Sequence, residues 1–239
     1  MDLNLTTKEV TGQNAPVGAA LVAQAMNSGE VSVRYKAMQA VKDWDRTRLG
    51  YRAVKRAFDI VFSGFVLAVI AIPSLVLAAA IRLESEGNPF YSQIRVGQTH
   101  RDGRLSTFRM WKFRSMRVDA EKDGVARLST GDKDDRITKV GHIIRACRLD
   151  ELPQLLNILK GDLSIVGPRP ERPEIAAQYC GEMPEFALRL QAKAGLTGYA
   201  QVYGKYNTTP YDKLQMDLMY IAHPSIVEDL KIMLATVKI

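Results

Sequence analysis

Residues 58–81 read FDIVFSGFVLAVIAIPSLVLAAAI, and the only charged side chain in this stretch, Asp59, lies at its edge. A straight helix of this length would be roughly 36 Å long, which is enough to cross a bilayer core of about 30 Å. A buried helix of a soluble protein is the alternative, but such helices seldom run this far without polar residues. The stretch therefore predicts a membrane helix, and it is not a cleavable signal peptide because it lies far from the N-terminus.

Two features of this helix argue against a simple crossing. Pro73 lies inside the stretch, where it removes a backbone hydrogen bond and bends a helix. Basic residues flank both ends, so the positive-inside rule gives no orientation; they are Arg52, Lys55 and Arg56 before the stretch and Arg82 and Arg95 after it. A helix that dips into one leaflet, bends at Pro73 and returns keeps both flanks in the cytoplasm. We therefore expect a re-entrant helix, with a spanning helix as the alternative.

Composition and charge narrow the class of partner. The chain of 239 residues is 46% hydrophobic and carries a formal net charge of +7, which suits anionic partners such as a membrane surface, nucleic acid or phosphorylated substrates. Basic residues are dense over residues 46–56, directly before the apolar stretch, and this favours a membrane surface. No nucleic-acid-binding motif is recognisable, so we expect no nucleic acid partner. Cys147 and Cys180 have no metal or redox spacing and are expected to be reduced thiols.

The second informative feature is the adjacent carboxylate pair Asp150 and Glu151. The apolar residues that follow recur at helical spacing, with Pro153 in the first turn and Gly161 after the last; they are Leu152, Leu155, Leu156 and Leu159. The pair then lies at the positive end of a helix, where ionised carboxylates are stabilised and can bind a cation or attack phosphorus. The alternative is that Asp150 only caps the helix.

The remaining pattern predicts a small mixed domain. Residues 89–97 and 105–113 read as short strands around a turn at residues 100–103. We expect a helix over residues 171–192, a loop through Gly204 and an amphipathic helix over residues 209–222. Residues 1–50 form an expected N-terminal extension, partly mobile, and a polar helix over residues 31–56 leads into the membrane segment.

Several motifs together resemble one family, the bacterial sugar transferases that act on polyprenol phosphate, also called monotopic phosphoglycosyl transferases. The resemblance covers residues 52–239, and the motifs that carry it are KRAFD at 55–59, FYSQ at 90–93, RVG at 95–97, KFRSM at 112–116, DRIT at 135–138, LDELPQL at 149–155, GDLSIVGPRPE at 161–171 and GLTG at 195–198. Any one could occur by chance, but their order and completeness make accident very improbable.

The resemblance implies an α+β, mostly helical fold. It implies a re-entrant helix-break-helix over residues 51–84, and interfacial amphipathic helices around a small cytoplasmic catalytic domain over residues 85–239. Larger relatives carry an upstream membrane bundle and a nucleotide-binding-like domain, and residues 1–50 are too short for either, so a minimal catalytic form is expected. The implied location is the cytoplasmic face of the bacterial inner membrane. The resemblance leaves open whether the protein forms a homo-oligomer.

The resemblance also implies an activity. Relatives transfer a phosphosugar from a UDP-sugar to undecaprenyl phosphate, release UMP and need Mg²⁺, as the first membrane step of exopolysaccharide, capsule or other glycoconjugate assembly. By similarity Asp150 is the nucleophile that forms a covalent aspartyl phosphosugar, and Glu151 assists in placing the metal or in deprotonating the acceptor. Asp150 and Glu151 are therefore the expected catalytic and metal-binding residues.

Basic residues supply the expected phosphate contacts. Arginine has a planar fork that matches two phosphate oxygens, which makes Arg145 and Arg169 the best candidates, and Pro168 beside Arg169 stiffens the turn that aims it. Lys112 and Arg114 alternate with aromatic residues, which places both cations on one face of a strand. The expected substrate-binding residues are thus Lys112, Arg114, Arg145, Pro168 and Arg169. The alternative is that these side chains only contact lipid headgroups.

Three other classes of protein remain as alternatives. A membrane-anchored nucleic-acid-binding protein explains the charge but lacks a motif. A non-catalytic membrane scaffold explains the bent helix but leaves Asp150, Glu151 and Arg169 unused. A multi-spanning sugar-phosphate transferase needs several apolar segments, whereas this sequence has one.

Overall fold

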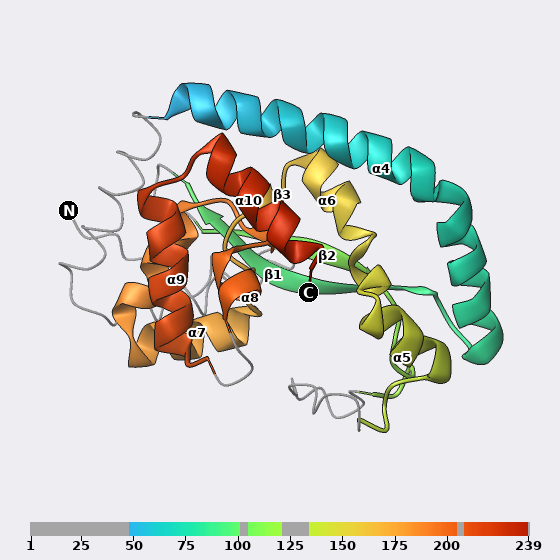
Figure 1. The fold of residues 1–239 in the computed structure, drawn as a ribbon. Helices are drawn as coiled ribbons and strands as arrows, with labels where there is room; N and C mark the ends of the chain where they lie inside the picture. The colour runs from blue at the N-terminus through green and yellow to red at the C-terminus, as the bar shows by residue number, and fades with distance from the viewer. Residues whose placement is uncertain (1–47, 101–104, 121–133, 205–207, 239) are drawn as a thin grey trace, which may run out of the picture. The chain divides into compact units, whose positions relative to one another are not determined.

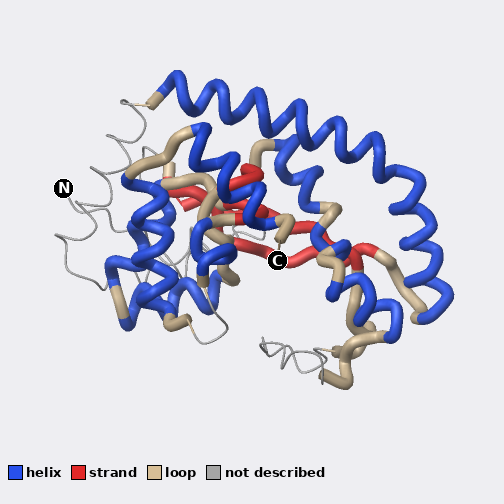
Figure 2. Tube along the Cα trace, viewed as in Figure 1, coloured by secondary structure: helices blue, strands red, loops and turns tan. Residues whose placement is uncertain are grey.

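The computed structural model describes residues 48–100, 105–120, 134–204 and 208–238, so most of the polar helix expected over residues 31–56 and most of the N-terminal extension lie outside it. The chain folds into two compact units. The first unit consists of residues up to 59, residues 94–109 and residues from 161 onward, and the second consists of residues 60–93 and 110–160. The predicted mostly helical α+β class is confirmed (Figure 1, Figure 2).

The first unit is built on a short parallel sheet. Strand β3 (Ser164–Val166) pairs with β4 (Gly195–Thr197), with Ser164 opposite Gly195. The helical elements of this unit include α7 (Pro173–Glu182), η2 (Pro184–Gln191), α8 (Tyr199–Tyr203), α9 (Pro210–Ala222) and α10 (Ile226–Thr236). One core cluster in it packs Phe186 and Leu214 against Cys180, and burial raises the pKa of the Cys180 thiol to about 11. That thiol therefore stays protonated and serves as core packing.

The second unit holds the acidic pair. Its helical elements are α5 (Lys139–Ala146), the 3-10 helix η1 (Leu149–Glu151) and α6 (Gln154–Lys160). Strand β1 (Phe90–Thr99) lies beside β2 (Leu105–Phe113), and the boundary between the units crosses both strands. These strands confirm the two predicted from sequence. Their core side chain Phe113 packs with Ile81 and Ile144.

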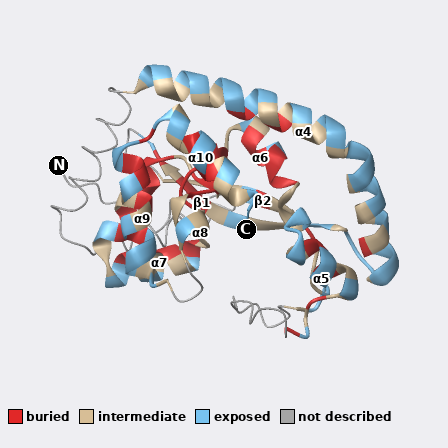
Figure 3. Ribbon diagram, in the orientation of Figure 1, coloured by how far each residue is buried: buried red, intermediate tan, exposed pale blue. Residues whose placement is uncertain are grey.

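Helix α4 (Leu49–Glu84) contains the apolar stretch. It is helical on both sides of Pro73, so the expected helix-break-helix is not confirmed, and in Figure 1 its second half curves instead. A proline removes one hydrogen bond and bends a helix without ending it. Apolar side chains of α4 lie on the surface, with Ile72 and Leu75 exposed by 75% and 71% (Figure 3). Such an apolar surface on a helix long enough to cross a bilayer favours a membrane environment.

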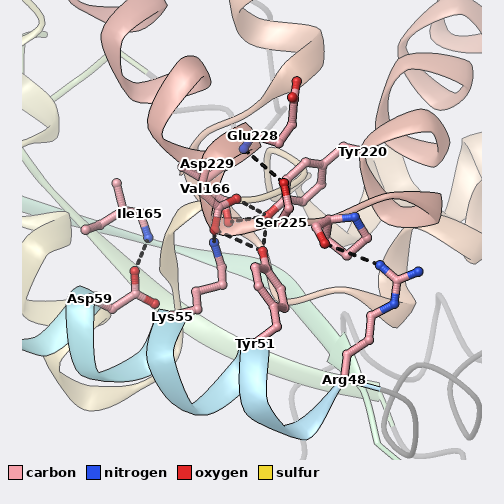
Figure 4. Close-up of polar contacts among 11 residues, drawn as sticks. Arg48, Tyr51, Lys55, Asp59, Ile165, Val166, Tyr220, Ser225, Glu228 and Asp229 are labelled. Carbon is pink, nitrogen blue, oxygen red and sulfur yellow. Dashed lines mark hydrogen bonds and ion pairs between the residues drawn. The ribbon is translucent and has the colours of Figure 1, made fainter.

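The N-terminal end of α4 is fixed within the first unit by a polar network (Figure 4). Lys55 Nζ lies 2.7 Å from Asp229 Oδ2, and the Tyr51 hydroxyl donates to the same oxygen at 2.9 Å. The Tyr220 hydroxyl donates to Asp229 Oδ1 at 2.8 Å. One turn further along the helix, the buried Asp59 carboxylate accepts a hydrogen bond from the Ile165 backbone amide at 3.0 Å. Side chains of α4 are thus joined to α9, α10 and β3.

Replacing Asp229 should destabilise this network strongly. Asp229→Ala leaves the ammonium of Lys55 partly buried without its partner, and the loss of one member of such a pair costs about 3 kcal/mol. We expect a clear fall in the thermal unfolding temperature of the detergent-solubilised protein. Glu228→Ala is the matched control, because that carboxylate pairs with the exposed Lys231 and should cost less than about 1 kcal/mol. Equal unfolding temperatures for the two variants would contradict the assignment.

Candidate active site

The structure brings Lys112 to both predicted catalytic carboxylates. Lys112 Nζ lies 3.0 Å from Glu151 Oε1 and 3.7 Å from Asp150 Oδ2. The three side chains are 20%, 13% and 15% exposed, respectively, so the group is partly shielded yet open to a ligand. A shared ammonium offsets the repulsion between adjacent carboxylates. The site therefore places a cation beside two carboxylate oxygen donors.

The backbone before the acidic pair turns sharply. Arg148 has φ 54° and ψ 22°, and it is the only residue besides glycine with positive φ in the described part of the chain. A side chain in this left-handed region costs of order 1 kcal/mol, so the surrounding structure must hold it there. The 3-10 turn of η1 follows at once and carries Asp150 and Glu151.

The sequence pattern predicted that the acidic pair lies at the first turn of an α-helix, and this prediction is wrong. Helix α6 begins at Gln154, after η1 and a further turn at Leu152 and Pro153. The first hydrogen bonds here join residues three apart, as in a 3-10 helix. The Leu155 amide donates to the Leu152 carbonyl, and the Leu156 amide donates to the Pro153 carbonyl. Asp150 and Glu151 are therefore presented by a 3-10 turn.

Asn157 positions the strand that carries Lys112. Its Oδ1 accepts a hydrogen bond from the Trp111 backbone amide at 3.0 Å, and its side chain is 1% exposed. This contact joins β2 to α6 next to η1 and explains how residues far apart in sequence form one group. Sequence reasoning missed Asn157, because the only signal was a polar residue inside an otherwise apolar helix pattern.

The other predicted basic residues of this unit occupy different positions. Arg145 lies in the last turn of α5, and its backbone carbonyl accepts a hydrogen bond from the Arg148 amide, just before η1. Arg114 instead donates from Nη2 to the Ser85 carbonyl at 2.6 Å, just after α4. Burial lowers the pKa of Arg114, and repulsion by Arg82 adds to the effect. Gly87, with φ 105°, leaves room for this side chain, since an added Cβ would lie 2.6 Å from Arg114 Nη1. The contacts of Arg114 indicate a structural role, and its predicted substrate role stays a prediction.

Pro168 and Arg169 belong to the first unit, in a turn where successive backbone carbonyls each accept a hydrogen bond. The Gly195 amide donates to the Pro168 carbonyl at 2.9 Å, and Arg189 Nη2 donates to the Arg169 carbonyl at 3.0 Å. Arg95 Nη1 donates to the carbonyl of the following residue, Pro170, at 3.2 Å. The backbone that carries Arg169 is thus rigid. The substrate contacts of Pro168 and Arg169 stay predictions.

Arg189 is a further residue that the sequence did not indicate. Its guanidinium is 4% exposed and forms a buried ion pair with Asp217 of α9. Because a buried charge needs a partner, this pair fixes the guanidinium that holds the Arg169 carbonyl. Only long-range contacts make this role visible.

The donor set fits magnesium better than a tightly held structural metal. Within the described residues, no cluster of three or more His, Cys, Asp or Glu side chains is placed to hold a metal ion. Magnesium commonly binds one or two carboxylates together with substrate phosphates and water. Asp150 and Glu151 supply such a pair, so the residues present fit Mg²⁺ that arrives with a phosphorylated substrate.

Comparison with known proteins identifies the family. The family model described as "Bacterial sugar transferase" matches residues 50–239. The chain is 42% identical over 77% of its length to the UDP-glucose:undecaprenyl-phosphate glucose-1-phosphate transferase of Caulobacter vibrioides, covering 68% of that protein. It is 40% identical over 79% of its length to the UDP-N-acetylgalactosamine-undecaprenyl-phosphate N-acetylgalactosaminephosphotransferase of Aeromonas hydrophila, and it covers 44% of that protein. It is also 40% identical over 78% of its length to a UDP-glucose:undecaprenyl-phosphate glucose-1-phosphate transferase of Escherichia coli, and it covers 40% of that protein. The chain therefore belongs to the bacterial sugar transferase family.

Proposed function

We propose that this protein transfers a sugar 1-phosphate from a UDP-sugar to undecaprenyl phosphate and releases UMP. The observation that carries the proposal is the group formed by Asp150, Glu151 and Lys112 in a chain whose family is established. The relatives above are named for this reaction with glucose or N-acetylgalactosamine, so the sugar differs within the family. Such a transfer would be the first membrane step in building a polysaccharide or another glycoconjugate.

The proposed chemistry has two displacement steps at phosphorus. An Asp150 carboxylate oxygen attacks the phosphorus that bears the sugar, the bond to the bridging oxygen breaks, and UMP leaves with that electron pair. A phosphate oxygen of undecaprenyl phosphate then attacks the aspartyl phosphosugar, forms the new diphosphate and returns Asp150 as a carboxylate. Splitting the transfer in this way replaces one difficult step by two easier ones.

The residues around Asp150 have distinct proposed roles. A bare carboxylate repels a diphosphate, so the Lys112 ammonium would lower this repulsion as the phosphate approaches. Glu151 would supply the second carboxylate and would take up a proton from the phosphate of undecaprenyl phosphate. Arg145 and Arg169 would bind phosphate oxygens through their planar forks. When bound by Asp150 and Glu151, Mg²⁺ would supply charge neutralisation at the phosphate oxygens.

Lys112→Gln should impair turnover strongly. The variant removes an ammonium that lies beside both carboxylates, and the lost charge-assisted contact is expected to cost about 1.5–3 kcal/mol of transition-state stabilisation. The measurement is kcat/KM for the UDP-sugar. Lys139→Gln, an exposed charge of the same unit, is the matched control and should leave kcat/KM within about twofold. Unchanged kinetics in Lys112→Gln would remove Lys112 from the proposed site.

The proposal places α4 in the membrane as a re-entrant helix, and contacts at its two ends support this. At the N-terminal end Lys55 pairs with Asp229. At the other end the Glu84 carboxylate accepts hydrogen bonds from the backbone amides of Lys139 and Val140, at 2.7 and 2.9 Å. Both partners follow α4 in the chain, and α4 is the only candidate spanning helix among the described residues. The stretches outside the description after α4 are too short for another. Both ends of α4 would then face the same side, the cytoplasm.

The direct test of the activity is product release. Detergent-solubilised protein is mixed with Mg²⁺, undecaprenyl phosphate and one member of a panel of UDP-sugars, including those of glucose, galactose and their N-acetylated amines. We expect continuous UMP release that needs both the acceptor and Mg²⁺ and that differs among the sugars, with no more than one UMP per protein molecule when the acceptor is omitted. Absence of UMP with every sugar in the panel would contradict the proposed function.

A further inference from the structure

A basic cavity lies in the first unit, whereas Asp150 belongs to the second unit. Its volume is about 520 Å³, and it is lined in part by the N-terminal end of α4. Four cationic residues and one carboxylate are among its lining residues; the cations are Arg52, Lys55, Arg56 and Lys193, and the carboxylate is Asp59. Lys55 already pairs with Asp229, and Asp59 accepts a backbone hydrogen bond. Among the lining residues, cations therefore outnumber carboxylates by four to one.

Two of these cations converge on one point of the backbone. A Cβ added at Gly161, which has φ 94°, would lie 3.4 Å from Arg56 Nη2 and 3.9 Å from Lys193 Nζ. Like charges this close repel, and such an arrangement costs free energy unless an anion offsets it. Asp59 and Asp162 lie near enough to offset part of this charge. An anionic ligand would add to this offset.

Lys193 and Ser164 provide unused donors at this cavity. The Lys193 ammonium makes no hydrogen bond or ion pair with any described residue, although burial lowers its pKa and repulsion by Arg56 adds to the effect. Ser164 is 1% exposed, and its hydroxyl has no hydrogen-bond partner in the described structure. A buried donor without a partner is destabilising, so a ligand acceptor at this place would be stabilising. Phosphate oxygens are such acceptors.

The position of the basic lining residues along α4 indicates that the phosphate belongs to a membrane lipid. Arg52 and Arg56 directly precede the exposed apolar surface of α4, which begins with side chains such as Phe58 and Val61. If α4 enters the bilayer here, its basic N-terminal end lies at the level of the lipid headgroups. Basic residues at that level are attracted to an anionic leaflet. A lipid phosphate can reach this cavity without leaving the membrane.

We propose that this cavity is a binding site for the phosphate head of a membrane lipid, with Lys193, Arg56 and Arg52 as its cations and Ser164 as a neutral donor. The site rests on the membrane placement of α4 made under the proposed function, but not on the catalytic chemistry at Asp150. The phosphate has two sources, the monoester of a polyprenyl phosphate or the diester of an anionic phospholipid. A monoester carries more negative charge near neutral pH, so we expect it to bind more tightly.

The test measures lipid binding without turnover. Full-length protein in a non-ionic detergent, with no UDP-sugar present, is titrated with undecaprenyl phosphate, phosphatidylglycerol, phosphatidylcholine or UMP, and bound ligand is counted by native mass spectrometry. We expect one strong equivalent of anionic lipid, with binding weakened about tenfold in Lys193→Gln and little changed in Lys193→Arg. Lys231→Gln, which removes an exposed charge from α10, is the matched control and should bind like the parent.

The titrations separate the possible outcomes. Tighter binding of undecaprenyl phosphate than of phosphatidylglycerol shows that the site prefers a phosphate monoester, and equal binding assigns it to bulk phospholipid; both support a lipid-phosphate site. Equal binding of phosphatidylcholine, tighter binding of UMP than of either anionic lipid, or parent-like binding by Lys193→Gln would overturn it. Arg52→Gln is the second variant if Lys193→Gln unfolds. Repeating the titration with Asp150→Asn separates the two proposals, because a protein that cannot turn over should still bind lipid at this cavity.

Discussion

Asp150→Asn should abolish UMP release while the protein keeps its fold and its membrane association. The amide has nearly the same shape as the carboxylate, but it lacks the anionic oxygen that would attack phosphorus and form an acyl phosphate. Asp150 lies on the 3-10 turn η1, and its ion pair with Lys112 is long, at 3.7 Å, so little stability depends on this pair. The measurement is UMP release with saturating UDP-sugar, beside the thermal unfolding temperature of the same preparation.

Two further variants make this test specific. Asp119→Asn is the matched control, because it removes one exposed carboxylate from the same unit and should keep normal turnover. Glu151→Gln should also be severely impaired, and omitting undecaprenyl phosphate then reveals which half-reaction needs it. If Asp150→Asn turned over like the parent protein, a covalent role for this residue would be excluded.

The elements that sequence predicts well are those with strong local patterns. Strands β1 and β2 were predicted within two residues at each end, since aromatic and β-branched runs were bounded by a turn. Helix α9 was predicted from its amphipathic spacing, and a Thr209 capping box fixes its start. The acidic pair was predicted from a sequence signal confined to a few residues, and its catalytic role stays a prediction.

Elements were missed where tertiary contacts override local pattern. The single helix expected over residues 171–192 is in fact α7 and η2, separated at Met183 because Pro184 cannot continue the helix. The expected loop before Gly204 contains the five-residue helix α8. Its length is below what propensity alone can stabilise, so its contacts with α9 and α10 decide its conformation.

The candidate site shows the same limit. Lys112 and Glu151 are 39 residues apart, and no spacing rule connects a strand to a 3-10 turn at that distance. The strand alternation suggested equal roles for Lys112 and Arg114, yet only the former meets the acidic pair, and the latter binds the carbonyl of Ser85. Side-chain partners depend on how elements pack, which local sequence does not specify.

Cysteine labelling should place both ends of α4 on the same side of the membrane. Gly50→Cys and Glu86→Cys, each in a background of Cys147→Ala and Cys180→Ala, put one thiol near each end of the helix. Gly50 has open space around it and Glu86 is exposed, so both thiols are accessible in the folded protein. In spheroplasts, an impermeant thiol reagent should label neither site, and both should react fully once the membrane is permeabilised. A variant that keeps only the exposed Cys147 reports the side on which the segments after α4 lie.

The opposite result has a clear meaning. Labelling of the Gly50→Cys site from outside would establish a spanning helix, and the Lys55–Asp229 ion pair would then be impossible, since its partners would lie on opposite sides of the bilayer. Pro73→Leu should shift the helix toward that spanning form, because it restores a helix hydrogen bond and removes a residue that costs about 3 kcal/mol inside a helix. The basic flank at Arg52, Lys55 and Arg56 opposes translocation. We therefore expect partial outside labelling of Gly50→Cys in the Pro73→Leu variant, together with reduced UMP release.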